Sequence, residues 1–367
     1  MRERVEAFLR ECVERGDIPG ACYAVSGPDG IVAEGAVGRA VVTPESVEAG
    51  TGTIYDLASL TKPLITSFLY LALRRRLGLS PDERVARFLP EIDRMDKREI
   101  TLRHLLTHTS GMPAWVPFYL RGGDMGEYLA QMREIVPEAR AGAKVIYSCA
   151  GYLMLGEILS RCATEPLDRL ATTVILGPLG LRDTAFNPPA AWWPRVAATE
   201  DSCQHERVMA RPGSDGYSGF RMGVIRGQVH DQNAWVLGGV AGNAGLFSTA
   251  RETLAIAREY LGGDVEGCRG LLDTEAIGRA REDQTGGMEE ARSWAFRIAL
   301  RGETAAGPDL PPQTFGHNGF TGTSVWIDPV GRRVYVLLTN RVHPRVLETS
   351  DMVGLRARFH SLARDLR

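Results

Sequence analysis

The chain has 367 residues but only three lysines, Lys62, Lys97 and Lys144, and it contains no long uncharged apolar run. A membrane-spanning helix needs about 18 or more such residues, so no membrane span is expected. The formal net charge of −2 provides no global field that would attract nucleic acid or an acidic membrane. These absences leave a small molecule as the expected partner.

The cysteines lack any pairing pattern. No two of them stand at CxxC spacing, which favours reduced thiols over a disulfide framework or a metal site. The six positions are 12, 22, 149, 162, 203 and 268. Residues 1–16 show an amphipathic helical pattern rather than a signal-peptide core, so we expect a cytoplasmic protein. Nothing in the sequence indicates its oligomeric state.

Strand patterns occur near both ends of the chain, and helical patterns fill the middle. The expected strands are residues 21–26, 31–37, 294–300, 322–327 and 333–338. The expected helices are residues 62–76, 102–108, 126–135, 151–162, 251–261 and 347–366. Glycine and proline cluster at residues 211–227 and 302–312, which we expect to be surface loops.

This order predicts an α+β fold. Hairpin connections imply an antiparallel sheet formed by the N- and C-terminal segments and flanked by the terminal helices. A large, mostly helical domain would be inserted between them. We place the sheet domain at residues 1–57 and 250–367 and the helical domain at residues 58–249. A cleft between the two is the expected place for a site.

The strongest chemical signal is Ser59-Leu60-Thr61-Lys62-Pro63, followed by an apolar helical stretch. Pro63 is tolerated in a first helical turn, so a helix is expected to begin near Ser59. Residues three apart share a helix face, which brings the Lys62 ammonium beside the Ser59 hydroxyl. An activated serine needs this arrangement, although the four residues alone also fit an N-cap serine with an exposed lysine.

Two further segments could complete a site. Tyr147 stands just before a predicted helix, and an ammonium such as that of Lys62 stabilises a phenolate, which could then act as a base. The alternative is a half-buried aromatic residue, with Ser148 capping the helix. His317 lies in a glycine-rich segment before a strand and could donate a hydrogen bond to a bound carbonyl, or could simply occupy a turn.

Together, Ser59-x-x-Lys62, Tyr147-Ser148-x and His317-x-Gly319 resemble the three motifs of the serine β-lactamase superfamily. The pattern is most similar to class C β-lactamases, family VIII carboxylesterases and D-amino-acid peptidases. The segments 100–111, 239–249 and 319–329 resemble the family as well. This resemblance implies a β-lactamase/transpeptidase-like fold shared with penicillin-binding proteins.

The resemblance also implies roles. Ser59 would form an acyl-enzyme, with Lys62 and Tyr147 sharing the acid and base duties. The backbone N–H groups of Ser59 and Phe320 would form the oxyanion hole, and His317 and Gly319 would contact substrate.

Two departures from the family motifs favour an ester substrate. Cys149 stands where lactamases and peptidases usually place an asparagine that holds the lysine and the substrate amide. His317 replaces a lysine, which removes a permanent positive charge expected to meet a substrate carboxylate. We interpret Cys149 as a small residue at a helix start that borders the substrate.

The remaining expectations concern the walls of the site. Trp115 and Tyr119 follow a Thr-Ser-Gly turn and could pack against substrate, or could only fill a loop. His104 and His108 are expected to support that turn, and no metal or organic cofactor is expected.

The sequence therefore predicts a serine hydrolase, specifically a carboxylesterase acting on small esters. A D-amino-acid peptidase or weak β-lactamase, or a catalytically silent binding protein of the same fold, are the alternatives.

Overall fold

The computed structural model describes residues 1–211, 213–263, 265–347 and 350–366. Strands gather near the two ends of the chain and helices between them. The strands are β1 Gly20–Gly27, β2 Gly30–Val41, β3 Val47–Glu48, β4 Tyr55–Asp56, β5 Ala185–Phe186, β6 Leu246–Ser248, β7 Ala291–Arg292, β8 Arg297–Ile298, β9 Phe315–Asn318, β10 Ser324–Asp328 and β11 Arg333–Thr339. The α-helices are α1 Arg2–Glu14, α2 Phe68–Leu73, α3 Leu102–Leu106, α4 Met125–Glu134, α5 Cys149–Ala163, α6 Leu167–Ala171, α7 Gln204–Met209, α8 Gln232–Val236, α9 Ala250–Arg258, α10 Thr274–Arg281 and α11 Met352–Ala363.

The main sheet has eight strands in the order β3-β2-β1-β11-β10-β9-β8-β7, and neighbouring strands are antiparallel. Its central pairing joins β1 from the start of the chain to β11 near the end, with Ala24 opposite Val336. The prediction of one antiparallel sheet built from both ends is therefore confirmed. The strands β4, β6 and β5 form a second, smaller sheet in the order β4-β6-β5.

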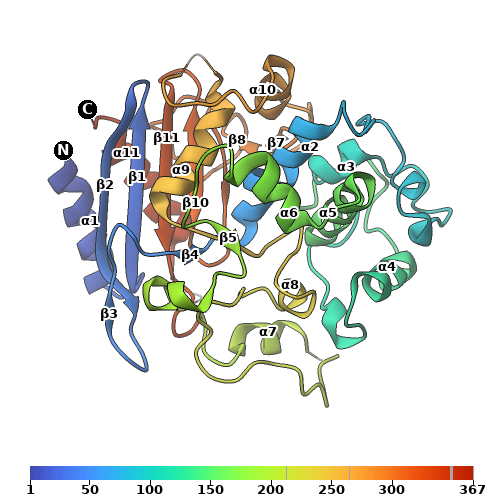
Figure 1. Ribbon diagram of the computed structural model, residues 1–367, viewed down its shortest axis with the longest axis horizontal. Helices are drawn as coiled ribbons and strands as arrows, with labels where there is room; N and C mark the ends of the chain where they lie inside the picture. The colour runs from blue at the N-terminus through green and yellow to red at the C-terminus, as the bar shows by residue number, and fades with distance from the viewer. Residues whose placement is uncertain (212, 264, 348–349, 367) are drawn as a thin grey trace.

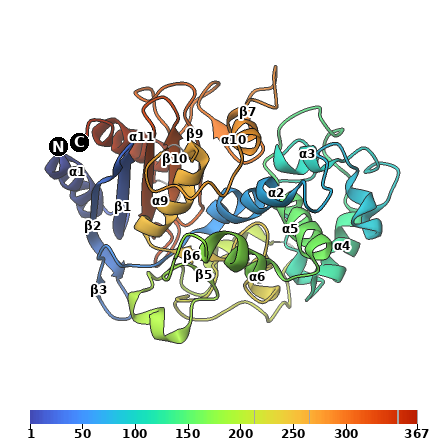
Figure 2. The same cartoon turned by 45° about the horizontal axis from the view of Figure 1, so that its top comes forward.

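Two apolar cores cover the two faces of the main sheet. Helices α1 and α11 pack on one face, where Leu9, Tyr23, Tyr335 and Phe359 are buried together. Helix α9 covers the other face, and the helical part of the chain lies beyond it (Figure 1). The N- and C-termini lie side by side at the outer helices (Figure 2). The domain division at residues 57/58 and 249/250 stays a prediction.

Some elements differ from the sequence prediction. The expected strand at 294–300 is instead the short pair β7 and β8, and residues 316–318, expected in a turn, form most of β9. Glycine is unfavourable in a strand, so the sequence pattern does not indicate β9. The structure explains Gly316, because a Cβ there would lie 2.3 Å from the Trp326 ring. Residues 348–349 of the expected final helix and residue 212 of the expected loop lie outside the described residues.

The predicted helix at 62–76 is also irregular. It comprises a π-helical turn, Lys62–Ser67, and α2, and a 3₁₀ turn, Ala58–Leu60, precedes it. The missing N–H of Pro63 suits such a start. None of the described helices has the length and apolar character that crossing a membrane requires.

Candidate active site

Ser59 lies in the 3₁₀ turn that links β4 to the π-helical turn. Ala58, immediately before it, has a positive φ of 48°, a conformation that costs an alanine roughly 1–2 kcal/mol. The Asp56 carboxylate holds this turn by accepting a hydrogen bond from the Ala58 N–H at 2.8 Å, and the Thr61 hydroxyl donates to the Ala58 carbonyl at 2.7 Å. The strained turn fixes the direction of the Ser59 side chain.

Lys62 is fully buried beside this serine. Its Nζ donates hydrogen bonds to Ser59 Oγ at 2.8 Å, to the Asn243 carbonyl at 3.0 Å and to Cys149 Sγ at 3.6 Å. Burial by itself lowers the pKa of Lys62, but the adjacent Cys149 and Tyr147 outweigh it and raise this pKa above that of an ordinary lysine. The serine therefore lies against a permanent cation.

Tyr147 faces the same cation from a distant loop. Its ring centre lies 5.1 Å from Lys62 Nζ, and the ring packs against His108 with a centroid separation of 4.4 Å. The Tyr147 oxygen is buried and has no hydrogen-bond partner among the described residues. The predicted meeting of hydroxyl, ammonium and phenol thus occurs, and the phenol oxygen retains unused hydrogen-bonding capacity.

The start of α5 holds the second motif in place. Ser148 is the N-cap residue, its side chain accepting from the Gly151 N–H, and its own N–H donates to His108 Nδ1 at 3.0 Å. Burial, reinforced by the Arg292 and Lys62 charges, holds the pKa of His108 well below its usual range, so this imidazole is a neutral acceptor. Burial raises the pKa of the Cys149 thiol, although Lys62 opposes the shift.

Strand β9 brings the third motif to the serine. The His317 ring lies 5.7 Å from the Tyr147 ring, and burial together with the Lys62 and Arg292 charges lowers its pKa well below the usual range. Gly319 is required by close packing, because a Cβ there would lie 2.6 Å from the Leu57 carbonyl oxygen.

Hydrogen bonds tie the turn after β9 to the serine turn. Thr321 Oγ1 donates to the Asp56 carbonyl at 2.8 Å, and Thr323 Oγ1 donates to the Leu57 carbonyl at 3.0 Å. The Gly319 N–H closes the turn on the Thr323 carbonyl at 2.7 Å. The Phe320 backbone is therefore fixed to the residues that immediately precede Ser59.

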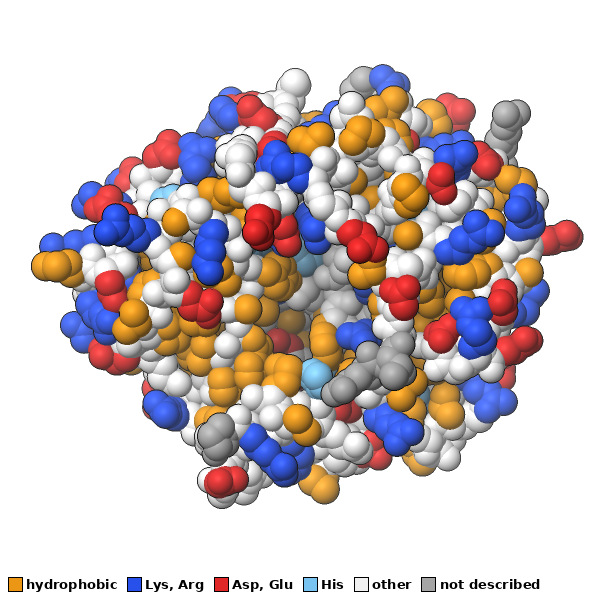
Figure 3. Space-filling view, turned by 180° about the vertical axis from the view of Figure 1, so that it is seen from behind, with side chains coloured by type: hydrophobic (Ala, Val, Ile, Leu, Met, Phe, Trp, Pro, Cys, Tyr) orange, Lys and Arg blue, Asp and Glu red, His pale blue; other side chains and the backbone are white. Residues whose placement is uncertain are grey.

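These residues line a cavity of about 350 Å³ that includes Ser59, Tyr147, His317, Gly319 and Phe320. Larger cavities, among them two of about 740 Å³ and two of about 440 Å³, lie elsewhere and do not include Ser59. The face shown in Figure 3 is hollowed near its centre, with charged side chains of both signs around the hollow.

Trp115 and Tyr119 are not among the residues that line this cavity. Tyr119 is buried and packs its ring against Tyr217 and Phe220, with centroid separations of 5.4 Å and 5.9 Å. Trp115 packs against the main core. Any contact of these two side chains with substrate stays a prediction.

Sequence reasoning missed Asn243 and His108 as parts of the site. Asn243 supplies its backbone carbonyl to Lys62, and its side chain donates to Asp231 at 3.2 Å. The available signal for Asn243 was the resemblance of the glycine-rich segment 239–249 to the family. In the described part of the chain, no cluster of His, Cys, Asp and Glu could hold a metal ion.

An antiparallel sheet with a helical layer, and a Ser-Lys-Tyr cluster in which the lysine is buried, define a serine hydrolase of the penicillin-recognising type. The family model named Beta-lactamase matches residues 5–356, and the chain belongs to this family.

Relatives and solved structures agree with this family. A protein of Escherichia coli (strain K12), whose name proposes a D-alanyl-D-alanine carboxypeptidase, is 33% identical over 329 residues, covering 84% of this chain and 74% of that protein. The fold is similar to that of EstCE1, a hydrolase with promiscuous acyltransferase activity, with a TM-score of 0.75, 19% identity and 98% of both chains covered. It is also similar to a penicillin-binding protein homologue from Caulobacter crescentus, with a TM-score of 0.74, 21% identity and coverage of 98% and 96%.

Proposed function

We propose that this serine hydrolase is a carboxylesterase that cleaves small esters through an acyl-enzyme on Ser59. The observation that carries the proposal is the 2.8 Å contact between Lys62 Nζ and Ser59 Oγ, with the Tyr147 ring 5.1 Å from the same ammonium. The substrate would be a small neutral or charged ester, and the reaction uses no organic cofactor.

In the acylation step, Tyr147 reacts as the phenolate: Ser59 Oγ attacks the ester carbonyl carbon, and its proton passes to the phenolate oxygen. The Lys62 ammonium stabilises the negative charge that moves between these two oxygens. Tyr147 then returns the proton to the departing alkoxide, so that the alcohol leaves and the acyl group stays on Ser59.

The carbonyl oxygen carries negative charge in this step. The N–H groups of Ser59 and Phe320 are the donors we assign to it, because the Thr321 and Thr323 bonds fix these two segments together. Water, deprotonated by Tyr147, then attacks the acyl-enzyme. The carboxylic acid is released and Ser59 recovers its proton.

An ester is favoured over an amide because of Cys149. Its thiol lies 3.6 Å from Lys62, where an asparagine in lactamases and peptidases would contact the substrate amide. An ester has no N–H that needs such a partner, and its alcohol leaves more easily than an amine. The small thiol thus suffices for ester cleavage.

Replacement of Ser59 tests the proposal. Ser59→Ala should abolish hydrolysis of 4-nitrophenyl butyrate and labelling by a fluorophosphonate, while Ser80→Ala, an exposed control outside the cavity, should keep both. The adduct on the parent enzyme, located by mass spectrometry of peptides, should sit on Ser59. Full esterase activity in the Ser59→Ala protein would refute the assignment.

A D-amino-acid peptidase is the second candidate, and the names of the 33% identical relatives favour it. Dipeptides of D-alanine and nitrocefin should be run beside the ester; a higher kcat/KM for either would replace the esterase assignment. A stable penicillin adduct without turnover would indicate a binding protein.

All six cysteines are free, which supports a reducing, cytoplasmic location as part of the proposal.

A further inference from the structure

His108 is a buried histidine that the proposed reaction does not use, although it lies against the phenol to which we assign proton transfer. It follows helix α3, and only 3% of its surface is exposed. Its ring packs against two tyrosine rings, with centroid separations of 4.4 Å from Tyr147 and 5.0 Å from Tyr152. Such close packing fixes the direction in which each nitrogen of the imidazole points.

The backbone of His108 has an uncommon conformation. Its φ is 59°, in the left-handed region where histidine, asparagine and aspartate are enriched among the residues that carry a side chain. Its N–H donates to the Leu105 carbonyl at 3.3 Å, and the N–H of Thr109 donates to the His104 carbonyl at 2.9 Å. The end of α3 therefore anchors the residue in this conformation.

His108 binds the chain on both sides of Tyr147. The Ile146 N–H donates to the His108 carbonyl at 2.8 Å, and the Ser148 N–H donates to His108 Nδ1 at 3.0 Å. Tyr147 lies between these two donors in the sequence, and its ring packs against the imidazole that accepts the second bond. One residue thus contacts the backbone before the tyrosine, the backbone after it and the ring itself.

The Nδ1 atom accepts a hydrogen bond only while the imidazole is neutral. Burial, and then the charges of Arg292 and Lys62, hold the pKa of His108 well below its usual range. The bond from the Ser148 N–H therefore persists at neutral and mildly acidic pH.

We propose that His108 is a positioning residue for the reaction: its carbonyl, its Nδ1 and its ring hold the Tyr147 oxygen within reach of Ser59. This role rests on the proposed function, since it assumes that Tyr147 transfers the proton. Proton transfer requires the two oxygens to approach to about 2.6–3.2 Å. A displacement of the phenol by about 1 Å would therefore cost about 100-fold in turnover while the protein stays folded.

Three substitutions separate the parts of this role. In His108→Asn, the side-chain oxygen can take the place of Nδ1, and asparagine also tolerates a positive φ. In His108→Gln, the longer side chain places its oxygen near the former position of Nε2 instead. His108→Phe keeps a ring against Tyr147 but has no acceptor for the Ser148 N–H.

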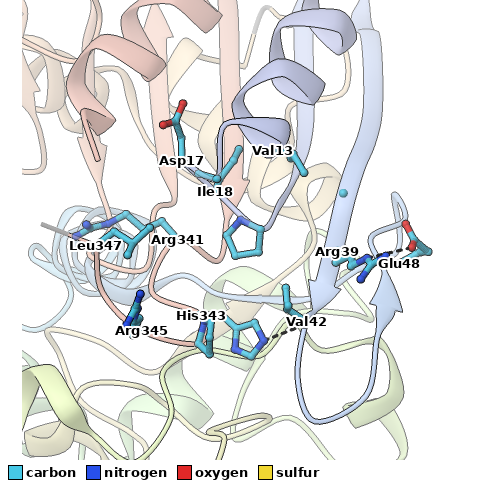
Figure 4. A pocket seen from close by; sticks show the side chains of 14 residues that line it. Val13, Asp17, Ile18, Arg39, Val42, Glu48, Arg341, His343, Arg345 and Leu347 are labelled. Atoms are coloured by element: carbon cyan, nitrogen blue, oxygen red, sulfur yellow. Dashed lines mark hydrogen bonds and ion pairs between the residues drawn. The ribbon is translucent and has the colours of Figure 1, made fainter. Parts of the chain in front are cut away.

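His343 provides a matched control. It is also 3% exposed, and burial lowers its pKa as well. Its Nε2 accepts a hydrogen bond from the backbone N–H of Val42, distant in the sequence, at 2.9 Å (Figure 4), and its Nδ1 contacts the Thr199 carbonyl at 2.7 Å. His343 is not among the described residues that line the cavity beside Ser59. Its replacement therefore removes comparable bonds outside the site.

The test measures the turnover of 4-nitrophenyl butyrate and the rate at which a fluorophosphonate labels Ser59. His108→Phe and His108→Gln should lower kcat by about 100-fold and slow labelling similarly, while KM changes by less than about threefold. His108→Asn should retain about tenfold more activity than His108→Gln, because it keeps the acceptor. His343→Phe should lower the urea midpoint of unfolding as His108→Phe does, yet leave kcat within about twofold.

A double substitution distinguishes positioning from a merely structural effect. If His108 acts through Tyr147, His108→Phe should lower kcat by no more than about twofold in the Tyr147→Phe background. A full loss in that background would overturn the proposal. Equal activities of His108→Asn and His108→Gln, or an equal loss of kcat in His343→Phe, would overturn it as well.

The labelling rate keeps this role separate from the esterase assignment, because it reports on the Ser59 nucleophile without an ester. Suppose that the parent hydrolyses no ester, but His108→Phe slows labelling and adds no further slowing to Tyr147→Phe. The esterase assignment then fails and the positioning role stands. If the parent cleaves the ester and Tyr147→Phe does not, while the His108 variants match the parent, only the positioning role fails.

Discussion

At the scale of single residues, the site depends on a lysine that cannot lose its proton easily. Burial lowers the pKa of Lys62, but Cys149 and Tyr147 raise it overall, so the proposed mechanism uses Lys62 as a charge and not as the base. In the same proposal Tyr147, whose buried oxygen lacks a hydrogen-bond partner in the described residues, is the group that takes the proton. The lysine would then act by charge and the tyrosine by proton transfer.

The Tyr147→Phe change isolates that role, because it removes one oxygen and keeps the ring between His108 and Arg292. Ester turnover should fall by about 10²–10⁴-fold. The free energy of unfolding should not decrease, since an unsatisfied buried hydroxyl contributes nothing to stability. Steady-state kinetics and urea unfolding measure the two effects.

Tyr335→Phe is the matched control. Tyr335 is fully buried on the other face of the sheet, and its oxygen also has no partner among the described residues. This variant should keep both activity and stability. Retained turnover in Tyr147→Phe would assign proton transfer to another group.

Cys149→Asn tests why this chain departs from the family motif. The new carboxamide would stand beside Lys62 and could contact a substrate amide, so the ratio of kcat/KM for a D-alanine 4-nitroanilide to that for a 4-nitrophenyl ester should rise by about tenfold. Cys149→Ser, which removes the thiol without adding an amide, should leave the ratio unchanged. A ratio that stays constant in both variants would show that this position does not select the substrate.

At the scale of elements, the site is assembled where α5 crosses the segment after α8. Gly156 and Gly242 meet at this crossing, and a Cβ on Gly242 would lie 2.1 Å from the Tyr152 carbonyl oxygen. The backbones can approach this closely because neither residue has a side chain. The approach places the next residue, Asn243, where its carbonyl accepts from Lys62.

Gly242→Ala should therefore lower the free energy of unfolding by about 1–3 kcal/mol and reduce activity by moving the Asn243 carbonyl. Urea unfolding and ester kinetics check this result. Gly278→Ala in α10, where an added Cβ would have no atom within 4 Å, should instead raise stability by about 0.5–1 kcal/mol. A neutral Gly242→Ala would mean that the crossing can relax.

Elements differ in how far the sequence predicts them. β1, β2, β10 and β11 follow from apolar patterns and their turns, and the ends of α4 and α5 agree to within two residues. β9 does not follow, because its Gly316 is explained by the close approach of Trp326 on the neighbouring strand, a contact that exists only in the folded chain.

At the scale of the whole molecule, motif order predicted which residues meet, but not which charges surround them. The family motifs contain four residues that are spread over 259 positions: Ser59, Lys62, Tyr147 and His317. The resemblance to the family predicted that these residues meet. The cavity beside Ser59 is also lined by four arginines that belong to none of the three motifs: Arg292, Arg297, Arg341 and Arg356. They converge because β7, β8, the segment after β11 and α11 lie around β9. Electrostatics of this kind can be read only from the assembled fold.

Acid stability is a property of the same assembly, because burial lowers the pKa of His360 in α11 to about 3. The unfolded chain binds a proton at this residue near pH 6.5 and the folded chain does not, so stability is full above pH 6.5 and declines as the pH falls towards 3. Between pH 7 and pH 5 this histidine alone should cost about 2 kcal/mol of unfolding free energy.

His360→Asn can keep a donor for the Ala305 carbonyl, which His360 Nδ1 contacts at 2.8 Å, but it has no group that titrates here. Urea unfolding at the two pH values should therefore show a loss of unfolding free energy that is about 2 kcal/mol smaller in the variant than in the parent. The pKa values of His104, His108, His317 and His343 are also lowered, and these residues account for the remaining dependence of stability on pH. Identical slopes for parent and variant would show that the buried imidazole gains a proton without unfolding the chain.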